Sequence, residues 1–469
     1  MVTDTTASGP ATATTPTTAD ATAPGTLTDP ASSTRLERRR GRWLHGWDPE
    51  NPAQWDAQGK SIARRNLVVS IAAEFLGFVV WAMWSIVVPK LPEAGFVLTA
   101  DQMFWLIALP ILVGATLRIP YTFAVPLVGG RNWTVVSALM LLIPASALVW
   151  AVQRPELGFT ALLAVAALAG LGGGNFASSM ANISFFYPAA VKGRALGINA
   201  AGGNLGTAVV QLVVPLVVVT AGGLALERAG LVLIPVILVV AVAAWRLMDN
   251  LTVARSDPRE FAAAARNRHT WIISFLYIGT FGSFIGYSGV FPLLLASAFP
   301  EVSLSLAFLG ALVGSLARPA GGMLADRLGG ARVTVACFGV MAAGGLGVLV
   351  ALQAHSFGLF FASFLVLFCG SGAGNGATYR MIPVVFAFGA ADDDALARAR
   401  KAAAGCLGIS GAIGALGGFA VPRGFAASTA ATGSIDVAIA VLVVAYLAMA
   451  AVTWAVYQRR GTALAAAGA

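Results

Sequence analysis

Long apolar runs alternate with short polar and basic segments along this chain. A helix needs about 20 apolar residues to cross the hydrocarbon core of a bilayer. Runs of that size predict six spanning helices in the first half and six in the second, separated by a polar segment at 249–270. The predicted spans are 67–89, 102–129, 133–152, 158–187, 196–220, 229–248, 271–296, 305–325, 333–353, 358–388, 403–421 and 436–457. The pattern therefore predicts an all-α membrane protein with 12 transmembrane helices.

Composition supports this class and argues against several others. The chain is 58% hydrophobic and 11% charged with a mean hydropathy of +0.79, whereas soluble domains carry about 25% charged residues. Its 3 cysteines fall within predicted spans and its 3 histidines outside them, so a disulfide or zinc framework is not expected. We expect no metal and no cofactor. Without a cluster of His or Cys the chain is not expected to be an enzyme, and its polar segments are too short for a receptor's signalling domain.

The basic residues predict the orientation. Cytoplasmic loops collect lysine and arginine, and only four of these residues, Lys90, Arg154, Arg228 and Arg423, fall in loops on the opposite side of the predicted spans. Both termini are therefore expected in the cytoplasm, and the protein in the inner cell membrane. The net charge of +9 follows from this topology. Because the charges are spread over many short loops, nucleic-acid binding is not expected.

The segments outside the spans differ in composition. Residues 1–42 are expected to be a disordered cytoplasmic tail, since they begin with a long stretch rich in Ala, Thr, Ser and Pro. Residues 43–66 combine basic residues with three tryptophans and predict an interfacial segment. The six-helix halves then occupy 67–248 and 271–457, joined by a cytoplasmic linker at 249–270, and residues 458–469 form a cytoplasmic tail.

The two halves are related in sequence. An offset of 200 residues places Leu112-Val113-Gly114 over Leu312-Val313-Gly314, and Arg118 over Arg318. The same offset superposes Gly129-Gly130 on Gly329-Gly330, and Gly174-Asn175 on Gly374-Asn375. In the following helix the offset grows to about 207, which aligns Pro215 with Pro422. Two pseudosymmetric halves of this kind place a substrate site between them, near the bilayer midplane.

Two arginines inside predicted spans are the main candidates for binding. An arginine at the centre of a membrane helix costs about 2.5–3.5 kcal/mol or more, and its guanidinium does not escape by losing a proton. A buried ion pair is the structural alternative, but Glu74 is the one carboxylate clearly within a span. One acid cannot neutralise both Arg118 and Arg318. The pair therefore predicts a site for a small, planar oxyanion, which guanidinium groups bind through parallel hydrogen bonds.

Other polar and aromatic residues in the spans have weaker signals. A transmembrane asparagine is as often a helix-packing residue as a ligand, and an aromatic side chain is usually a packing residue. Proximity to the glycine runs and the arginines favours these candidates: Asn175, Asn182, Asn204, Asn375, Phe176, Tyr277 and Phe281. Glu74 has two interpretations, a structural acid or a titratable group for proton coupling.

Several motifs resemble the nitrate/nitrite porter (NarK-type) family of the major facilitator superfamily. The resemblance covers residues 60–460. Its motifs include GLGGGNFASSMANISFFYP, AAGGNLGTAVVQ, LYIGTFGSFIGYS, GSLARPAGGMLADRLGG, GAGNGATYRMIP and GISGAIGALGGF. The resemblance implies a major facilitator fold that works by alternating access. It also implies nitrate bound between Arg118 and Arg318, with aromatic walls at Phe176 and Tyr277. The glycine-rich segments around Gly203-Asn204 and Gly408 to Gly418, including Gly411, would lie beside the anion.

The mode of transport follows from energetics. Bringing a negative charge into a cell with a negative interior is opposed by about 2.3 kcal/mol per 100 mV, so nitrate uptake must be coupled. Exchange for nitrite is electroneutral and needs no titratable group. The alternative is nitrate/proton symport with Glu74 as the coupling group. The expected partners are nitrate, nitrite and the lipid bilayer, and the expected functional unit is a monomer.

Overall fold

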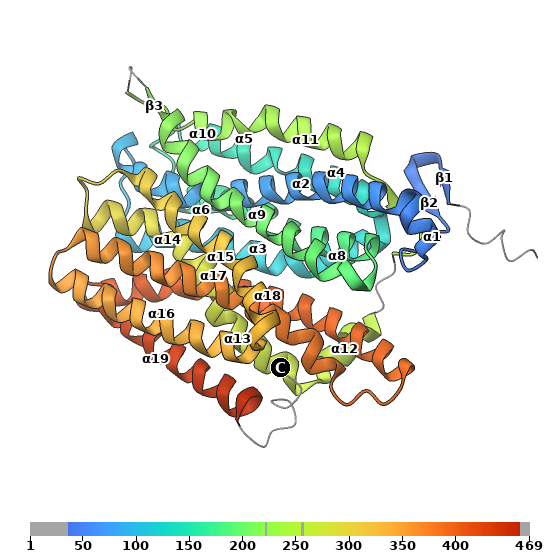
Figure 1. The fold of residues 1–469 in the computed structure, drawn as a ribbon. Helices are drawn as coiled ribbons and strands as arrows, with labels where there is room; N and C mark the ends of the chain where they lie inside the picture. The colour runs from blue at the N-terminus through green and yellow to red at the C-terminus, as the bar shows by residue number, and fades with distance from the viewer. Residues whose placement is uncertain (1–35, 221–222, 255–257, 460–469) are drawn as a thin grey trace, which may run out of the picture. The chain divides into compact units, whose positions relative to one another are not determined.

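The structure, a computed structural model, describes residues 36–220, 223–254 and 258–459. Within these residues, 12 helical segments are long and apolar enough to cross a membrane, which confirms the predicted number. They span Pro52–Lys90, Ala100–Val128, Gly130–Ala151, Phe159–Phe186, Ala189–Val218, Arg228–Leu247, Arg268–Ala298, Leu304–Leu328, Gly330–Gln353, Phe357–Ala387, Asp393–Thr432 and Asp436–Gln458. Figure 1 shows the spans running roughly side by side.

Several spans contain more than one helix. The helices of the first half are α1 (Pro52–Gln54), α2 (Lys60–Val87), α3 (Ala100–Val128), α4 (Gly130–Met140), α5 (Leu142–Ala151), α6 (Phe159–Leu168), α7 (Gly170–Gly173), α8 (Asn175–Phe186), α9 (Ala189–Val218), α10 (Arg228–Leu231) and α11 (Leu233–Leu247). Those that follow are α12 (Pro258–Arg266), α13 (Arg268–Tyr277), α14 (Ser283–Ala298), α15 (Ala307–Leu328), α16 (Gly330–Gln353), α17 (Phe357–Ala387), α18 (Asp393–Thr432) and α19 (Asp436–Thr453).

The remaining elements are short. Three-residue 3₁₀ turns form η2 (Arg40–Arg42), η4 (Val88–Lys90), η5 (Pro92–Ala94) and η7 (Leu304–Leu306), and π turns form η3 (Trp55–Gly59), η6 (Ile278–Gly282) and η8 (Trp454–Gln458). The strands are β1 (Glu37–Arg39), β2 (Trp43–His45), β3 (Val219–Thr220), β4 (Gly223–Leu224) and β5 (Asn250–Leu251). We call the end of the helix bundle that carries β1, β2 and β5 the tail end, and the opposite end the distal end.

The turn that follows the second span of each half has the same backbone geometry in both halves. Gly129 ends α3 with φ 94° and Gly329 ends α15 with φ 90°. These left-handed conformations suit glycine because it has no Cβ. The turns lie 200 residues apart, at the positions that the internal repeat superposes. The repeat therefore extends to the local backbone.

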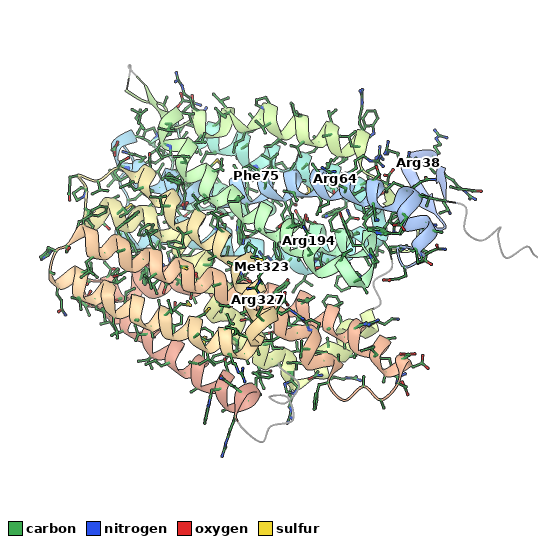
Figure 2. All side chains as sticks on the ribbon, viewed as in Figure 1. Arg38, Arg64, Phe75, Arg194, Met323 and Arg327 are labelled. Atoms are coloured by element: carbon green, nitrogen blue, oxygen red, sulfur yellow. The ribbon has the colours of Figure 1, made fainter. Side chains whose placement is uncertain are left out.

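The halves meet along helices from both. α9 of the first half packs against α15 of the second, and α3 packs against α18. Figure 2 labels Arg194 on α9 and Met323 on α15, near the middle of the view. The two arginine-bearing helices, α3 and α15, therefore both lie at the contact between the halves.

The segment before the first span is folded rather than part of a disordered tail. Strands β1 and β2 pair antiparallel, and β2 pairs parallel with β5, which lies at the end of the sixth span. Residues 36–42 therefore belong to the folded body, in contrast to the predicted tail boundary at 42. The part of the predicted tail before residue 36, and the predicted C-terminal tail from residue 460, lie outside the described residues.

A buried carboxylate holds this small sheet to the bundle. Asp249 is 0% exposed. It pairs with Arg38 at 3.2 Å, with Arg42 at 3.0 Å and with Arg65. Its backbone N–H donates to the side chain of Asn66 at 2.8 Å. One aspartate therefore joins the N-terminal segment, the first span and the end of the sixth.

Two polar stretches contain more helix than their composition predicts. The linker 249–270 contains α12, and the acidic-basic stretch Asp392 to Lys401 forms the first turns of α18. The Asp392 side chain accepts a hydrogen bond from the Ala395 N–H at 2.6 Å, the contact expected of an N-cap aspartate. Helix propensity and a good cap thus extend the eleventh span beyond its apolar part.

Candidate functional site

Arg118 and Arg318 are both buried at the contact between the halves. Arg118 lies on α3 and is 2% exposed, and Arg318 lies on α15 and is 5% exposed. Each follows a glycine by four residues. A Cβ at Gly114 would meet Trp81 and the Gly173 backbone, and a Cβ at Gly314 would meet the Phe284 ring. The small residues let both helices approach their neighbours closely, which places the arginine one turn later deep in the bundle.

The two guanidinium groups share the same aromatic rings. The guanidinium carbon of Arg118 lies 4.6 Å from the centroid of Phe176 and 4.8 Å from that of Phe281. The guanidinium carbon of Arg318 lies 5.6 and 5.9 Å from the same two centroids. The rings stack on each other with centroids 6.0 Å apart. The positive groups therefore converge on one aromatic pair, whose faces attract cations.

Few polar groups of the chain contact these guanidiniums. Arg118 donates from Nη1 to the carbonyl of Gly411 at 2.8 Å, while its Nε and Nη2 have no partner. Arg318 donates from Nη2 to the Tyr277 hydroxyl at 3.5 Å, and its Nη1 has no partner. Within the described residues neither arginine forms an ion pair. Buried N–H groups without partners are costly, so this region is suited to an added oxyanion.

A π turn shapes the second half's side of the site. Residues Ile278–Gly282 form η6, between α13 and α14, and such turns are frequent at functional sites. Tyr277 directly precedes this turn and Phe281 lies within it, and their rings stack with centroids 5.2 Å apart. The Tyr277 hydroxyl donates to Asn375 at 2.8 Å, which leaves the Asn375 Nδ2 without a partner. The hydrogen bond to Asn375 therefore holds the Tyr277 hydroxyl beside Arg318.

Glu74 lies in a polar cluster of the first half. It is 0% exposed, and Asn199 donates to its Oε2 at 2.7 Å. The same Asn199 nitrogen lies 2.6 Å from the Ser179 hydroxyl, which lies 2.9 Å from the Ser70 hydroxyl. The other carboxylate oxygen of Glu74, Oε1, has no partner. Glu74 therefore has the protein contacts of a structural acid together with a free oxygen.

The structure brings together most but not all of the predicted site residues. Phe176, Phe281, Tyr277, Asn375 and Gly411 lie around the two arginines through the contacts given above. Gly203 instead lies against Glu74, because a Cβ there would meet the carboxylate.

The other asparagines are placed differently. Asn175 lies at the crossing of α8 with α2, since a Cβ at Gly77 would come within 2.9 Å of the Asn175 Cβ. Asn182 lies against Gly130 at the start of α4, since a Cβ at Gly130 would meet the Asn182 side chain. Asn204 is 1% exposed with no partner for its Oδ1. In the described part of the chain, none of these three asparagines forms a hydrogen bond with either arginine.

Two aromatic residues at the site were not predicted. Tyr379 lies 5.4 Å from the Arg318 guanidinium carbon, and its ring is 5.4 Å from that of Tyr277. Trp81 lies 5.6 Å from the Arg118 guanidinium carbon and donates to the Pro110 carbonyl at 2.7 Å. Tyr379 follows Asn375 by four residues on α17, so helical spacing alone places both on one face.

The halves are also tied together at the distal end. Arg423 on α18 pairs with Asp101 on α3 at 2.9 Å and lies over the Trp105 ring at 4.1 Å. Deeper in the bundle, Gln211 on α9 donates to the Ser288 carbonyl on α14 at 2.6 Å. These contacts join the two halves on the distal side of the arginine site.

Comparison with known proteins places the chain among transporters. A family model described as Major Facilitator Superfamily matches residues 73–422. The nitrate/nitrite transporter NarU of Salmonella typhimurium is 42% identical over 456 residues, which cover 91% of this chain and 99% of that protein. The probable nitrate/nitrite antiporter NarK2 of Thermus thermophilus is 35% identical over 91% of this chain and 99% of its own length.

Solved structures with a similar fold include a D-xylose-proton symporter. It has a TM-score of 0.65 and 14% sequence identity, over 84% of this chain and 97% of that one. At this identity the likeness concerns the fold alone.

Proposed function

The chain belongs to the Major Facilitator Superfamily, and we propose that within it this protein takes up nitrate in exchange for nitrite by alternating access. Full-length similarity to named nitrate/nitrite transporters supports nitrate and nitrite as substrates. The observation that carries the proposal is the convergence of Arg118 and Arg318 over the shared Phe176 and Phe281 rings.

Nitrate suits the chemistry of this site. It is planar, carries a delocalised charge and has three acceptor oxygens, which match guanidinium N–H groups that have no protein partner. A guanidinium that stacks on a ring face keeps its N–H groups, which lie in its own plane, available to an anion. Arg118, Arg318, Tyr277 and the amide of Asn375 are the groups that we propose bind it.

Exchange accounts for how the site is coupled to movement of the halves. Without an anion, bringing the halves together presses two guanidiniums toward each other, and a bound anion offsets this repulsion. The anion therefore interacts more favourably with the occluded arrangement, which is the condition for a ligand to shift a conformational equilibrium. Nitrate entering and nitrite leaving in turn keep the cycle electroneutral.

The proposed orientation places the tail end, with both termini, in the cytoplasm of a bacterial inner membrane. The distribution of basic residues favours it, because only four lysines and arginines, Lys90, Arg154, Arg228 and Arg423, lie at the distal end. On this basis the contacts around Arg423 close the outer side of the pathway. The proposed functional unit is a monomer, since each chain contains both arginines.

Breaking the ion pair between Arg423 and Asp101 should shift the equilibrium from the conformation closed at the distal end toward the one open there. Arg423→Gln removes the pair with Asp101, which is partly exposed. Exposed pairs contribute about 0.2–1 kcal/mol, so the population open at the distal end should rise by a factor of about 1.4 to 5. Distances between spin labels at the distal ends of α3 and α18 report this shift. An unchanged distribution would show that the pair does not help to close the gate.

Counterflow tests the exchange mechanism. Proteoliposomes loaded with nitrite, or with no permeant anion, are given external nitrate at a fixed pH gradient. Exchange requires internal nitrite for uptake and does not depend on the pH gradient. Uptake without internal nitrite that follows the pH gradient would instead support nitrate/proton symport.

The environment of Glu74 supports nitrate/proton symport as the second candidate mechanism. Its carboxylate is fully buried, and one oxygen has no partner in the described residues. An acid in such a position is a candidate for proton coupling. The hydrogen bonds from Asn199 equally fit a structural role.

Glu74→Gln distinguishes these two roles. Glutamine keeps the size of the side chain and an oxygen that accepts from Asn199, but it cannot carry a proton as a carboxylate does. If the protein is an exchanger, counterflow by the variant should stay within about twofold of the unmodified protein, because a near-isosteric change costs only a few tenths of a kcal/mol. If the protein is instead a nitrate/proton symporter, uptake driven by the pH gradient should be lost in the variant. Equal loss of both activities would mean that the acid is structural.

A further inference from the structure

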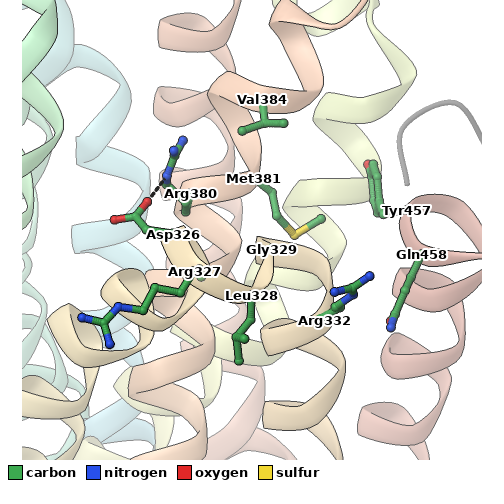
Figure 3. Close-up of a pocket in the computed structure, with 12 residues that line it drawn as sticks. Asp326, Arg327, Leu328, Gly329, Arg332, Arg380, Met381, Val384, Tyr457 and Gln458 are labelled. Atoms are coloured by element: carbon green, nitrogen blue, oxygen red, sulfur yellow. Dashed lines mark hydrogen bonds and ion pairs between the residues drawn. The ribbon is translucent and has the colours of Figure 1, made fainter. Parts of the chain in front are cut away.

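A cavity of about 310 Å³ opens at the tail end of the second half. It lies where α15 ends, α16 begins and η8 ends, close to the water boundary of four spans. Its lining includes Arg327, Arg332, Arg380, Asp326, Leu328 and Gln458 (Figure 3). In liquid water each molecule occupies about 30 Å³, so the cavity has room for roughly ten water molecules. A small inorganic anion would fill only a fraction of it.

The lining carries an excess of positive charge. Asp326 pairs with Arg380. Within the described residues no acidic side chain pairs with Arg327 or Arg332. Figure 3 shows these two arginines on either side of Leu328, whose side chain is 51% exposed. The two guanidiniums can contact the charged headgroup of a lipid, and the apolar side chain between them can contact the start of its acyl chains.

The equivalent place in the first half is filled by the chain itself. The repeat aligns Gly129-Gly130 with Gly329-Gly330, and Asn132 with Arg332. A Cβ at Gly129 would meet Asn250 and Trp43, and the Asn132 N–H donates to the Asn250 side chain at 3.3 Å.

The first half also supplies an anion of its own at this end. The Asp249 carboxylate, next to Asn250, neutralises Arg38, Arg42 and Arg65. In the second half the corresponding end of the sixth span contributes Tyr457 and Gln458, which are uncharged. The two halves thus differ at this place, because within the described residues the second half has two arginines, Arg327 and Arg332, that no carboxylate pairs with.

We propose that this cavity binds the headgroup of an anionic phospholipid, with the phosphodiester held by Arg327 and Arg332 and the acyl chains passing over Leu328. Arginine pairs phosphate oxygens through two parallel hydrogen bonds, and basic pockets between spans are a known setting for such headgroups. The site is separate from the arginine pair of the transport pathway and does not depend on the substrate of transport.

Lipid binding to the purified protein tests the proposal. Native mass spectrometry follows the titration of cardiolipin, phosphatidylglycerol and zwitterionic phosphatidylcholine into the detergent-solubilised full chain. The unmodified protein should retain the two anionic lipids and not phosphatidylcholine. Each arginine removed should weaken binding about fivefold, the factor for about 1 kcal/mol per basic residue. Arg327→Gln combined with Arg332→Gln should therefore weaken it about 25-fold.

Arg246→Gln is the matched control, since Arg246 is an exposed arginine at the tail end of α11, outside the cavity. It should bind both anionic lipids as the unmodified protein does. Cardiolipin should also raise the unfolding temperature of the unmodified protein and of this control, but not of the double variant. If the double variant does not purify as a folded protein, the two single variants provide the same comparison.

Three results would overturn the proposal. The first is equal anionic-lipid binding by the unmodified protein and the cavity variants. The second is equal retention of phosphatidylcholine and the anionic lipids. The third is calorimetric binding of inorganic phosphate or nitrate, lost in the cavity variants, without any lipid binding. That last result would assign the cavity to soluble anions.

Discussion

Replacing Arg118 or Arg318 by alanine should abolish nitrate binding and transport. Each guanidinium is almost fully buried and has N–H groups that no protein acceptor satisfies. Loss of one partner from a buried, hydrogen-bonded charge pair costs about 2–5 kcal/mol. Nitrate affinity should therefore fall by roughly 30- to several thousand-fold, as measured by calorimetry and by counterflow.

Lysine at the same positions should restore little of this affinity. A lysine keeps the positive charge but has a compact ammonium that cannot form two parallel hydrogen bonds to a planar anion. Arg154→Ala is the control and should bind nitrate normally, because Arg154 is a partly exposed arginine at the distal end whose guanidinium donates to the Trp150 carbonyl at 2.7 Å. Normal nitrate binding by both the Arg118 and Arg318 alanine variants would show that the two arginines do not form the anion site.

Asp249→Ala should cause the largest loss of stability. The carboxylate is fully buried and holds three arginines from two segments. Removing one partner of a buried ion pair costs about 3–5 kcal/mol. We expect about 3 kcal/mol here, because the three arginine side chains are 27–44% exposed and regain water. Thermal unfolding in detergent measures the change.

Asp326→Ala provides the comparison for Asp249. Asp326 also pairs with an arginine, but its side chain is 55% exposed, and exposed pairs contribute about 0–1 kcal/mol. The unfolding temperature should therefore change little. If Asp249→Ala were no more destabilising than Asp326→Ala, the N-terminal segment would not be anchored by its arginine cluster.

Sequence alone predicts those features that the apolar interior of the bilayer constrains. A charge in an apolar run is costly, so Arg118 and Arg318 stand out without any structure, and the 200-residue offset relates them. The spans were predictable because the bilayer imposes their length. The aromatic candidates Phe176, Tyr277 and Phe281 were identified through neighbouring glycines, which mark close helix approach.

Other features depend on contacts between distant parts of the chain. Sequence alone gave no reason to pair Trp43 with Asn250, which lie about 200 positions apart, so the strands of the N-terminal segment were missed. The same holds for the network that joins Glu74 to Asn199. The family resemblance implies a place beside the anion for Gly203, and neighbouring glycines favour Asn175, but glycine-rich motifs mark helix crossings as readily as ligand sites.

A structure determined in the presence of nitrate tests the central claim most directly. We predict density for one planar anion between Arg118 and Arg318, with the partner-free Nε and Nη2 of Arg118 and Nη1 of Arg318 within hydrogen-bonding distance of its oxygens. Density for the anion elsewhere, or guanidiniums that each turn away to a protein carboxylate, would contradict it.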